Sequence, residues 1–211
     1  LETSHTMEGS YDVVIFEGDY PAWPGVIRDS QGRLLCGFRE DGLADRKEGG
    51  HHYSPVGRAM LTISDDNGKT WSSPTIAIDN PNYDDTGLSI VELPDRSLLA
   101  SYGSRLSDSR YSQAWVSSSL DGGQTWSPSI KISVHQNTLV RGAPVPLSNG
   151  DILVPIYGST HSRLGDVSMT AISSDGGKTW AEGYIPNTTS GKLNEWVALE
   201  VEPGRLIGLH R

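Results

Sequence analysis

The chain has 211 residues, a formal net charge of −9 and one cysteine, Cys36, which is expected in a β-core. The acidic balance argues against a nucleic-acid partner or an anionic membrane, because both carry negative charge. No run of eighteen apolar residues is present, so no transmembrane helix is predicted. The low cysteine content fits the cytosol or a bacterial exterior, and a secreted, cell-surface or periplasmic location is the favoured expectation.

Residues 1–19 are expected to form an N-terminal segment that is processed or partly a tag, since the chain does not begin with Met. From residue 20 onward, short runs of Val, Ile, Leu and Tyr alternate with Gly, Pro, Asn, Asp and Ser, which predicts β-strands joined by turns. Paired hydrophobic runs flank turns centred on Gly32, Arg96, Gly150 and Gly204. The last three turns are 54 residues apart and the first step is 64, which predicts an insertion between Glu40 and Pro55.

A second pattern, Ser-x-Asp-x-Gly-x-Thr-Trp, occurs three times in step with these turns, with its tryptophans 55 and 54 residues apart. The Asp is expected to accept backbone hydrogen bonds in a turn, the Gly to adopt positive φ, and the Trp to supply apolar surface. The predicted structural residues are Ser64, Asp66, Gly68, Trp71, Ser119, Asp121, Gly123, Trp126, Ser173, Asp175, Gly177 and Trp180. A period near fifty residues with four strands per unit is typical of a repeat architecture.

The three signatures resemble the Asp-box (BNR) repeats of the sialidase, or neuraminidase, superfamily, and the resemblance covers about residues 20–211. It implies an all-β fold, a β-propeller of the six-bladed sialidase type with about four blades in this chain and the last one truncated. It implies further that self-association or a longer chain supplies the missing blades, while a closed four-bladed ring is a third option. The resemblance places the Asp-boxes at the periphery of the blades, away from the active site.

In this family three arginines bind the substrate carboxylate, a Tyr with a neighbouring Glu is the nucleophile, and an Asp is the general acid/base. The stretch NEWVALEVEPGRLIGLHR resembles the family segment in which a Glu and an Arg lie sixteen residues apart. The resemblance therefore assigns Glu195 as the base and Arg211 as a carboxylate-binding residue. Arg39 lies seven residues after its turn, as Arg211 does, and Arg141 lies nine before its turn, as Glu195 does. Guanidinium groups at these positions are suited to an anionic sugar.

The first unit departs from the family, because Ala22-Trp23-Pro24 stands where sialidases have Arg-Ile-Pro and the first arginine is missing. Trp23 and Trp196 lie nine and eight residues before their turns, so they are expected either to stack on a sugar or to pack between blades. Asp84 or Asp85 is expected to point to the pore. The family's Tyr and third arginine would lie beyond Arg211.

The loop before the first Asp-box contains the candidates for the acid/base residue, which are Asp41, Asp45, His51 and His52. None matches the family pattern clearly, but His52 or Tyr53 lies closest to the expected position, and a His can exchange a proton near neutral pH. Asp41 and His52 are therefore kept as catalytic candidates.

The favoured function is exo-acting hydrolysis of a sialic-acid-like acidic sugar at the propeller mouth. One alternative is a non-catalytic propeller module that binds a glycan or a protein. Another is a BNR-type hydrolase or lyase that acts on a different sugar through Arg39, His52 and Glu195. No cofactor and no metal are expected, because the six histidines lack ligand spacing and the acidic turns lack the spaced oxygens of an EF-hand.

Overall fold

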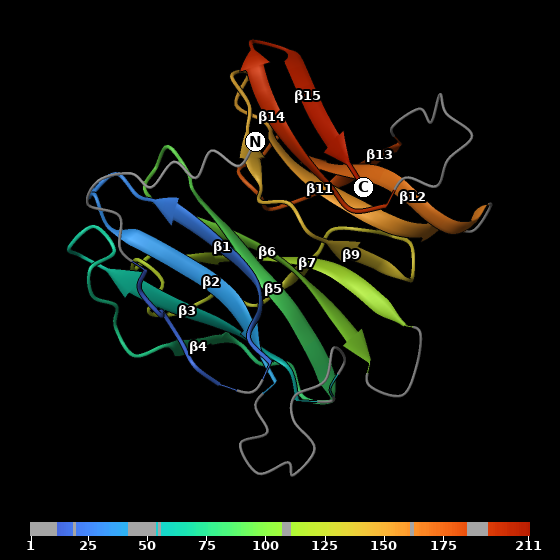
Figure 1. Cartoon of the computed structure of the whole chain (residues 1–211). Coiled ribbons are helices and arrows are strands. Elements are labelled where there is room, and N and C mark those ends of the chain that lie inside the picture. The colour runs from blue at the N-terminus through green and yellow to red at the C-terminus, as the bar shows by residue number, and fades with distance from the viewer. Residues whose placement is uncertain are drawn as a thin grey trace, which may run out of the picture.

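The computed structural model describes residues 12–18, 20–41, 54, 56–106, 111–160, 163–184 and 194–211. Within these residues the regular structure is antiparallel β, arranged in four sheets that follow one another along the chain (Figure 1). This confirms the all-β prediction. No helix long and apolar enough to span a membrane occurs in the part of the chain that the structure describes.

The first and second sheets are four-stranded meanders in which each strand pairs with the next one along the chain. The strands of the first sheet are β1 (Ala22–Arg28), β2 (Leu34–Glu40), β3 (Arg58–Ser64) and β4 (Thr75–Ile78). Those of the second are β5 (Tyr83–Glu92), β6 (Leu98–Leu106), β7 (Ser112–Ser119) and β8 (Ile130–Lys131). Both sheets match the predicted four strands per unit.

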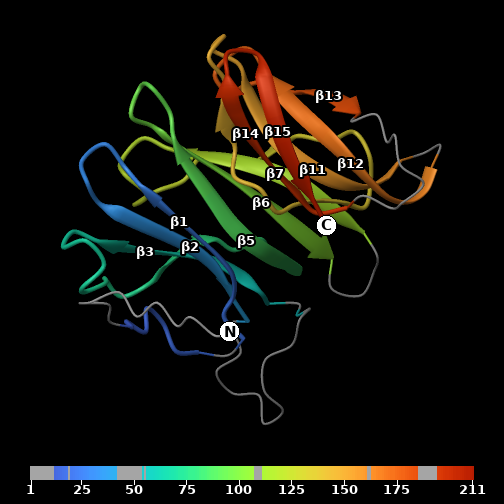
Figure 2. The same cartoon turned by 45° about the horizontal axis from the view of Figure 1, so that its top comes forward.

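The third sheet keeps this plan, but its first strand is divided into two pieces that both pair with the same neighbour. Its strands are β9 (Thr138–Val140), β10 (Val145–Pro146), β11 (Ile152–Thr160), β12 (Arg163–Ser173) and β13 (Ala181–Tyr184). The fourth sheet is a hairpin of β14 (Trp196–Glu202) and β15 (Arg205–His210). Figures 1 and 2 show the four sheets as an arc from blue to red.

The four predicted turns lie at equivalent places, between the first two strands of each sheet. Gly32, Gly150 and Gly204 have φ of 87°, 91° and 76°. Arg96 takes the same conformation, with φ of 73°, although it has a side chain. A residue with positive φ closes each of these tight hairpin loops, which explains why Gly occupies three of the four positions.

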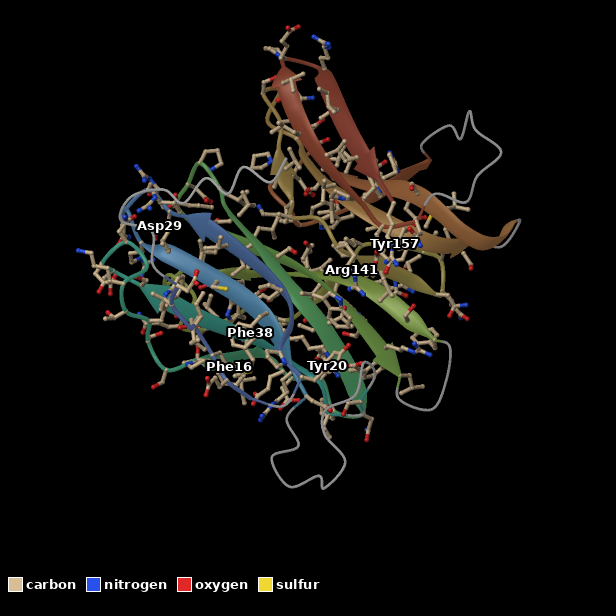
Figure 3. The ribbon with its side chains drawn as sticks, in the orientation of Figure 1. Phe16, Tyr20, Asp29, Phe38, Arg141 and Tyr157 are labelled. Atoms are coloured by element: carbon tan, nitrogen blue, oxygen red, sulfur yellow. The ribbon has the colours of Figure 1, made fainter. Side chains whose placement is uncertain are left out.

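Apolar side chains fill the space between successive sheets. One buried cluster joins the first sheet to the second and includes Leu35, Leu61, Leu88 and Leu98. A second cluster joins the second sheet to the third and includes Leu99, Val116, Val154, Ile156 and Met169. The preceding segment also contacts the first sheet, because the rings of Phe16 and Phe38 lie 5.1 Å apart (Figure 3).

The three Asp-box signatures form one repeated hydrogen-bonded turn between the third and fourth strands of a sheet. In the second sheet, Ser119 Oγ donates to Asp121 Oδ1 at 2.8 Å and accepts the Gly123 N–H at 2.8 Å. Asp121 also accepts the N–H and the hydroxyl of Thr125, at 2.9 and 2.6 Å. The same bonds recur around Asp66 and Asp175. The predicted turn role of the signature is confirmed.

Candidate functional site

The end of the sheets opposite the turns and the Asp-boxes brings together side chains from all four sheets. The positions nine residues before the four turns are Trp23, Gly87, Arg141 and Glu195. Arg141 Nε lies 3.1 Å from Glu195 Oε1, and the Arg141 guanidinium lies over the Trp23 ring at 4.3 Å. Equal spacing from the turn therefore places these residues at one depth around a common centre.

Arg39, at the end of β2, is fully buried between two carboxylates. Its Nε lies 2.7 Å from Asp84 Oδ1 on β5, and its Nη2 lies 3.7 Å from Asp41 Oδ1. Asp84 Oδ2 also accepts the Ser54 N–H at 3.2 Å. A Cβ at Gly57 would lie 1.8 Å from Asp84 Oδ1, so only glycine fits beside this ion pair. Burial raises the pKa of Asp84, and the Arg39 guanidinium opposes only part of that effect.

Glu195 bridges two arginines on the other side of the site. Its Oε1 pairs with Arg141 Nε at 3.1 Å, and its Oε2 accepts from Arg211 Nη1 at 2.5 Å. Partial burial raises the pKa of Glu195, but the two guanidinium groups outweigh burial and lower that pKa. The Arg211 side chain is 78% exposed, whereas that of Arg141 is 14% exposed. Glu195 is thus an ionised carboxylate that orients two cations, the largely buried Arg141 at the pocket and the exposed Arg211.

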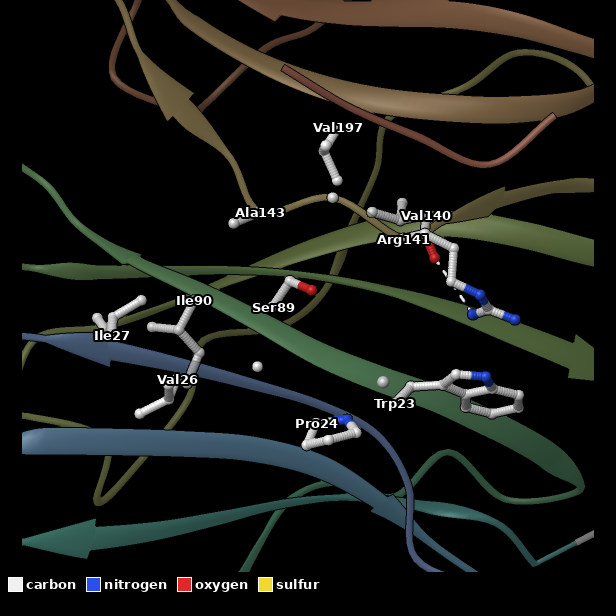
Figure 4. Close-up of a pocket in the computed structure, with 13 residues that line it drawn as sticks. Trp23, Pro24, Val26, Ile27, Ser89, Ile90, Val140, Arg141, Ala143 and Val197 are labelled. Carbon is white, nitrogen blue, oxygen red and sulfur yellow. Dashed lines mark hydrogen bonds between the residues drawn. The ribbon is translucent and has the colours of Figure 1, made fainter. Parts of the chain in front are cut away.

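A pocket of about 310 Å³ lies along the first strands of the sheets, with Arg141 and Trp23 at one edge (Figure 4). Arg141 belongs to the segment between β9 and β10, and its guanidinium extends toward the Trp23 ring at that edge (Figures 3 and 4). The rest of the lining is largely apolar and includes Val26, Ile90 and Val197. The pocket therefore has a cationic group at one edge and a largely apolar lining elsewhere. This combination is suited to an anionic ligand with some apolar surface.

Asp85 differs from its neighbour Asp84, because its partners are Ser104 on β6 and Asn80 in the connection before β5, with no guanidinium among the described residues. It accepts hydrogen bonds from Ser104 Oγ at 2.5 Å and from the N–H and side-chain amide of Asn80 at 2.6 and 2.9 Å. Burial raises its pKa to about 6, although these hydrogen bonds oppose the shift. Of the two aspartates expected at the pore, Asp84 thus faces Arg39 and Asp85 faces away from it.

Trp196 has the packing role that was one of its two predicted alternatives. It is 5% exposed, and its Nε1 donates to the carbonyls of Ile156 and Met169 at 2.9 and 3.1 Å. Its ring stacks on His210 at 5.1 Å. A sugar cannot reach this indole, so Trp196 ties the fourth sheet to the third.

The remaining predicted site residues divide into those that the structure describes and those that it does not. Asp41 is fully buried beside Arg39. His52, like Asp45 and His51, lies outside the described residues. The sequence reasoning missed Gly87, although its position nine before Arg96 was a usable signal. It also missed the pairing of Asp84 with Arg39, for which no local signal exists.

The charges of the two halves of the site differ. Arg39 faces two carboxylates, Asp84 and Asp41. Arg141 and Arg211 share one, Glu195, among the residues that the structure describes. The Arg141–Glu195–Arg211 cluster therefore has one more guanidinium than carboxylate, an arrangement suited to a further anionic group.

Comparison with known families gives two matches to this chain. The family model described as a BNR repeat-like domain matches residues 98–211, slightly more than half of the chain. The BNR/Asp-box repeat model matches residues 62–73, which include the first Asp-box. Among curated protein sequences, none matches.

Solved structures share the fold at low sequence identity. A protein of unknown function from Dyadobacter fermentans is 22% identical, with a TM-score of 0.78 over 93% of this chain and 63% of its own. A mutant of the NanB sialidase from Streptococcus pneumoniae is 14% identical, with a TM-score of 0.71 over 94% of this chain and 50% of its own. An ulvan lyase, a polysaccharide lyase, is 13% identical, with a TM-score of 0.56 over 85% of this chain and 46% of its own.

The chain spans only about half to two-thirds of the length of these structures. At these identities the likeness concerns the fold, which sialidases and a polysaccharide lyase share. Together with the family match over residues 98–211 and the three Asp-boxes, it shows that this chain belongs to the BNR repeat-like family and has a sialidase-like fold.

Proposed function

We propose that this chain is part of a glycan-processing protein that binds an acidic sugar where the first strands of its sheets converge. The four sheets are about four blades of a six-bladed, sialidase-type β-propeller in this proposal. The remaining blades come from further chain or from a second copy. The reaction proposed first is exo-acting hydrolysis of a sialic-acid-like residue.

The observation that supports the proposal best is the Arg141–Glu195–Arg211 cluster beside the pocket. Guanidinium groups bind carboxylates and sulfates through paired N–H donors, and a carboxylate that fixes their orientation lowers the cost of ordering them. One shared carboxylate cannot neutralise two guanidinium groups, so the cluster attracts a further anion. A neutral sugar would gain much less from this arrangement.

Catalytic roles are proposed for Glu195, Asp41 and His52. Glu195 is proposed as the partner of a nucleophile, although its lowered pKa makes it a weak proton acceptor until a ligand displaces one of its arginines. Asp41 and His52 are proposed as acid/base candidates. Arg39 is better suited to holding Asp84 and Asp41 in place than to binding the ligand, because its guanidinium is fully buried between them.

A second candidate function is a lyase acting on a uronic-acid polysaccharide. The structural likeness to an ulvan lyase favours it, and so does the Ala22-Trp23-Pro24 segment that stands in place of the first sialidase arginine. Both reactions use an acidic sugar, so binding of the anionic group does not separate them. A non-catalytic glycan-binding module is the third candidate. Turnover of either substrate would exclude it.

The test measures binding and turnover together. Calorimetry with N-acetylneuraminic acid, glucuronic acid and neutral galactose should show binding of an acidic sugar only. Arg141→Ala should weaken that binding about tenfold or more, since a charged hydrogen bond contributes about 1.5–3 kcal/mol. The matched control is Arg205→Ala, an exposed ion-paired arginine at the start of β15, which should change nothing.

Turnover is then measured on the ring completed by the further chain or the second copy, with a chromogenic sialoside and with a uronic-acid polysaccharide, whose cleavage by a lyase yields an unsaturated product. Glu195→Gln should abolish turnover and lower the urea unfolding midpoint only modestly, because the removed charge stabilises the folded state but its side chain is 24% exposed. Equal binding of galactose and the acidic sugars would contradict the proposed function. Binding without turnover on either substrate would favour the non-catalytic module.

A further inference from the structure

Trp23 connects the two arginine groups of the site. The guanidinium carbon of Arg141 lies 4.3 Å from the centre of its ring, and that of Arg39 lies 5.7 Å from it. A guanidinium above an aromatic face is attracted by the negative charge density of that face. We propose that Trp23 is a positioning residue, which fixes the Arg141 guanidinium so that its free N–H groups meet the anionic group of the sugar.

The backbone at Trp23 supports a dedicated role. Its φ is 52°, a left-handed conformation that is a genuine outlier for a bulky side chain. Pro24 follows, which further restricts Trp23, and the pairing of β1 with β2 slips between Ala22 and Gly25. Such a conformation persists only where the surroundings determine it, and it occurs most often at functional sites. This irregularity turns the indole toward the third sheet.

Gly87 provides the space for the Trp23 side chain. It occupies the equivalent position of the second sheet, and its φ is 36°. A Cβ at Gly87 would lie 3.3 Å from the Trp23 Cβ, a contact tighter than side chains usually make. The absence of a side chain in the second sheet therefore lets an indole from the first sheet reach an arginine of the third.

The remaining contacts of Arg141 show which of its atoms stay available. Nε donates to Glu195, and Nη1 makes long contacts with Thr86 Oγ1 at 3.4 Å and the Val140 carbonyl at 3.3 Å. Nη2 has no hydrogen-bond partner among the described residues. The ring of Trp23 and the carboxylate of Glu195 thus fix the plane of the guanidinium, and Nη2 remains for a ligand.

This assignment differs from one of the two sequence-based alternatives for Trp23, stacking on a sugar, because a guanidinium already lies over the ring. It rests on the proposed function only for the identity of the anion. The position of Arg141 relative to Trp23 can be measured without any ligand, so the two proposals can fail separately.

The first measurement uses the ¹⁵N-arginine-labelled 211-residue chain. The Nε–H proton of Arg141, assigned through Arg141→Lys, should be shifted by the ring current of Trp23. It should move toward the ordinary arginine value in Trp23→Leu and stay near its original value in Trp23→Phe. An unchanged resonance in Trp23→Leu would overturn the proposal.

The second measurement is affinity for N-acetylneuraminic and glucuronic acids. Trp23→Leu should weaken binding of the acidic sugar about tenfold, and Trp23→Phe about threefold or less, because a phenyl ring still attracts the cation. Equal losses in the two variants would contradict a positioning role. If Trp23→Leu does not fold, a nuclear Overhauser contact between the Trp23 ring and Arg141 in the unmodified chain replaces it. Absence of that contact would overturn the proposal.

Discussion

Carboxylates at the two ends of the sheets behave in opposite ways. At the turn end, the Asp-box carboxylates accept hydrogen bonds from threonine hydroxyls, backbone N–H groups and serine hydroxyls, which lower the pKa of Asp66 and of Asp121 to about 2. At the site end, burial raises the pKa of Asp85 to about 6 and also raises that of Asp84. The turn end repeats the same bonds in three sheets, whereas the site end uses each carboxylate once.

Residues that repeat from unit to unit thus lie at the turn end of the strands, whereas the residues of the candidate site, at the opposite end, do not repeat. A turn that every unit must make is encoded by the same residues each time. The residues nine before the turns instead differ in every unit, being an indole, a glycine, a guanidinium and a carboxylate. They do not share one structural task, and two of them, Trp23 and Glu195, contact a third, Arg141.

The largest expected effect comes from the buried arginine at the site end. Arg39→Met removes the cation between Asp84 and Asp41 and should lower the free energy of unfolding by about 3–5 kcal/mol, because it leaves buried carboxylates uncompensated. Urea denaturation measures this loss of unfolding free energy. The control Arg205→Met breaks an ion pair whose side chains are about two-thirds exposed, and it should cost less than about 0.5 kcal/mol.

A double variant tests the cause of that loss. Arg39→Met combined with Asp84→Asn removes both charges of the closest pair and should recover part of the stability lost in the single variant. If the double variant loses the sum of the two single losses, the charges do not interact and the interpretation is wrong.

The next effect concerns pH and Asp85. Its pKa is raised from 3.8 to about 6 by folding, so the protonated form is favoured in the folded state. Its contribution to stability is fully present below about pH 4 and is lost as pH rises through about 6, by at most about 3 kcal/mol. The unfolding free energy of the unmodified chain minus that of Asp85→Asn should therefore fall between pH 4 and pH 7.

Asp121→Asn is the matched control at the turn end. The pKa of Asp121 is lowered in the folded state, so its contribution to stability is present above about pH 4 and is lost only as pH falls toward about 2. The unfolding free energy of the unmodified chain minus that of Asp121→Asn should therefore not change between pH 4 and pH 7. A slope there, or a flat profile for Asp85, would remove the contrast between the two ends.

A smaller effect is expected from a buried hydroxyl of the repeated turn. Ser119→Ala removes the acceptor of the Gly123 N–H and one donor to Asp121, and should cost about 1–3 kcal/mol. Ser118→Ala, one residue earlier on β7, serves as the control and should cost less than about 0.5 kcal/mol. The two midpoints in urea should therefore separate clearly, and equal midpoints would show that the Asp-box hydrogen bonds contribute little.

Much of this arrangement could be predicted by counting residues from the turns. The count placed Arg141 and Glu195 at one depth, and the structure brings them together at 3.1 Å. The structure also shows why Trp23 lines the pocket and Trp196 is buried. Successive side chains of a strand point to opposite faces, so a residue eight before the turn is buried where one nine before the turn faces the pocket.

Other features could not be derived from the sequence, because they depend on how separate sheets meet. Asp84 and Arg39 are 45 residues apart and lie on different sheets, so no spacing rule connects them. The contact of Trp23 with Arg141 needs both a left-handed residue and a glycine in the neighbouring sheet. Each of these is an exception to the conformation that neighbouring residues favour, and contacts between separate sheets determine it.

The smallest expected effect concerns the one of the four turns in which the residue with positive φ is not a glycine. Arg96 has φ of 73°, in a loop where Gly32 and Gly150 occupy the same position. Arg96→Gly should stabilise the chain by about 0.5–1 kcal/mol, because relief of the left-handed strain exceeds the extra entropy of an unfolded glycine. The reciprocal Gly150→Ala should cost about 1 kcal/mol of backbone strain alone, since a Cβ there meets no atom within 4 Å. Thermal and urea midpoints that move in opposite directions would show that the turn end is set by backbone conformation. A destabilised Arg96→Gly would instead show that the Arg96 side chain, which lies 4.0 Å from Glu92, contributes more than its exposed position suggests.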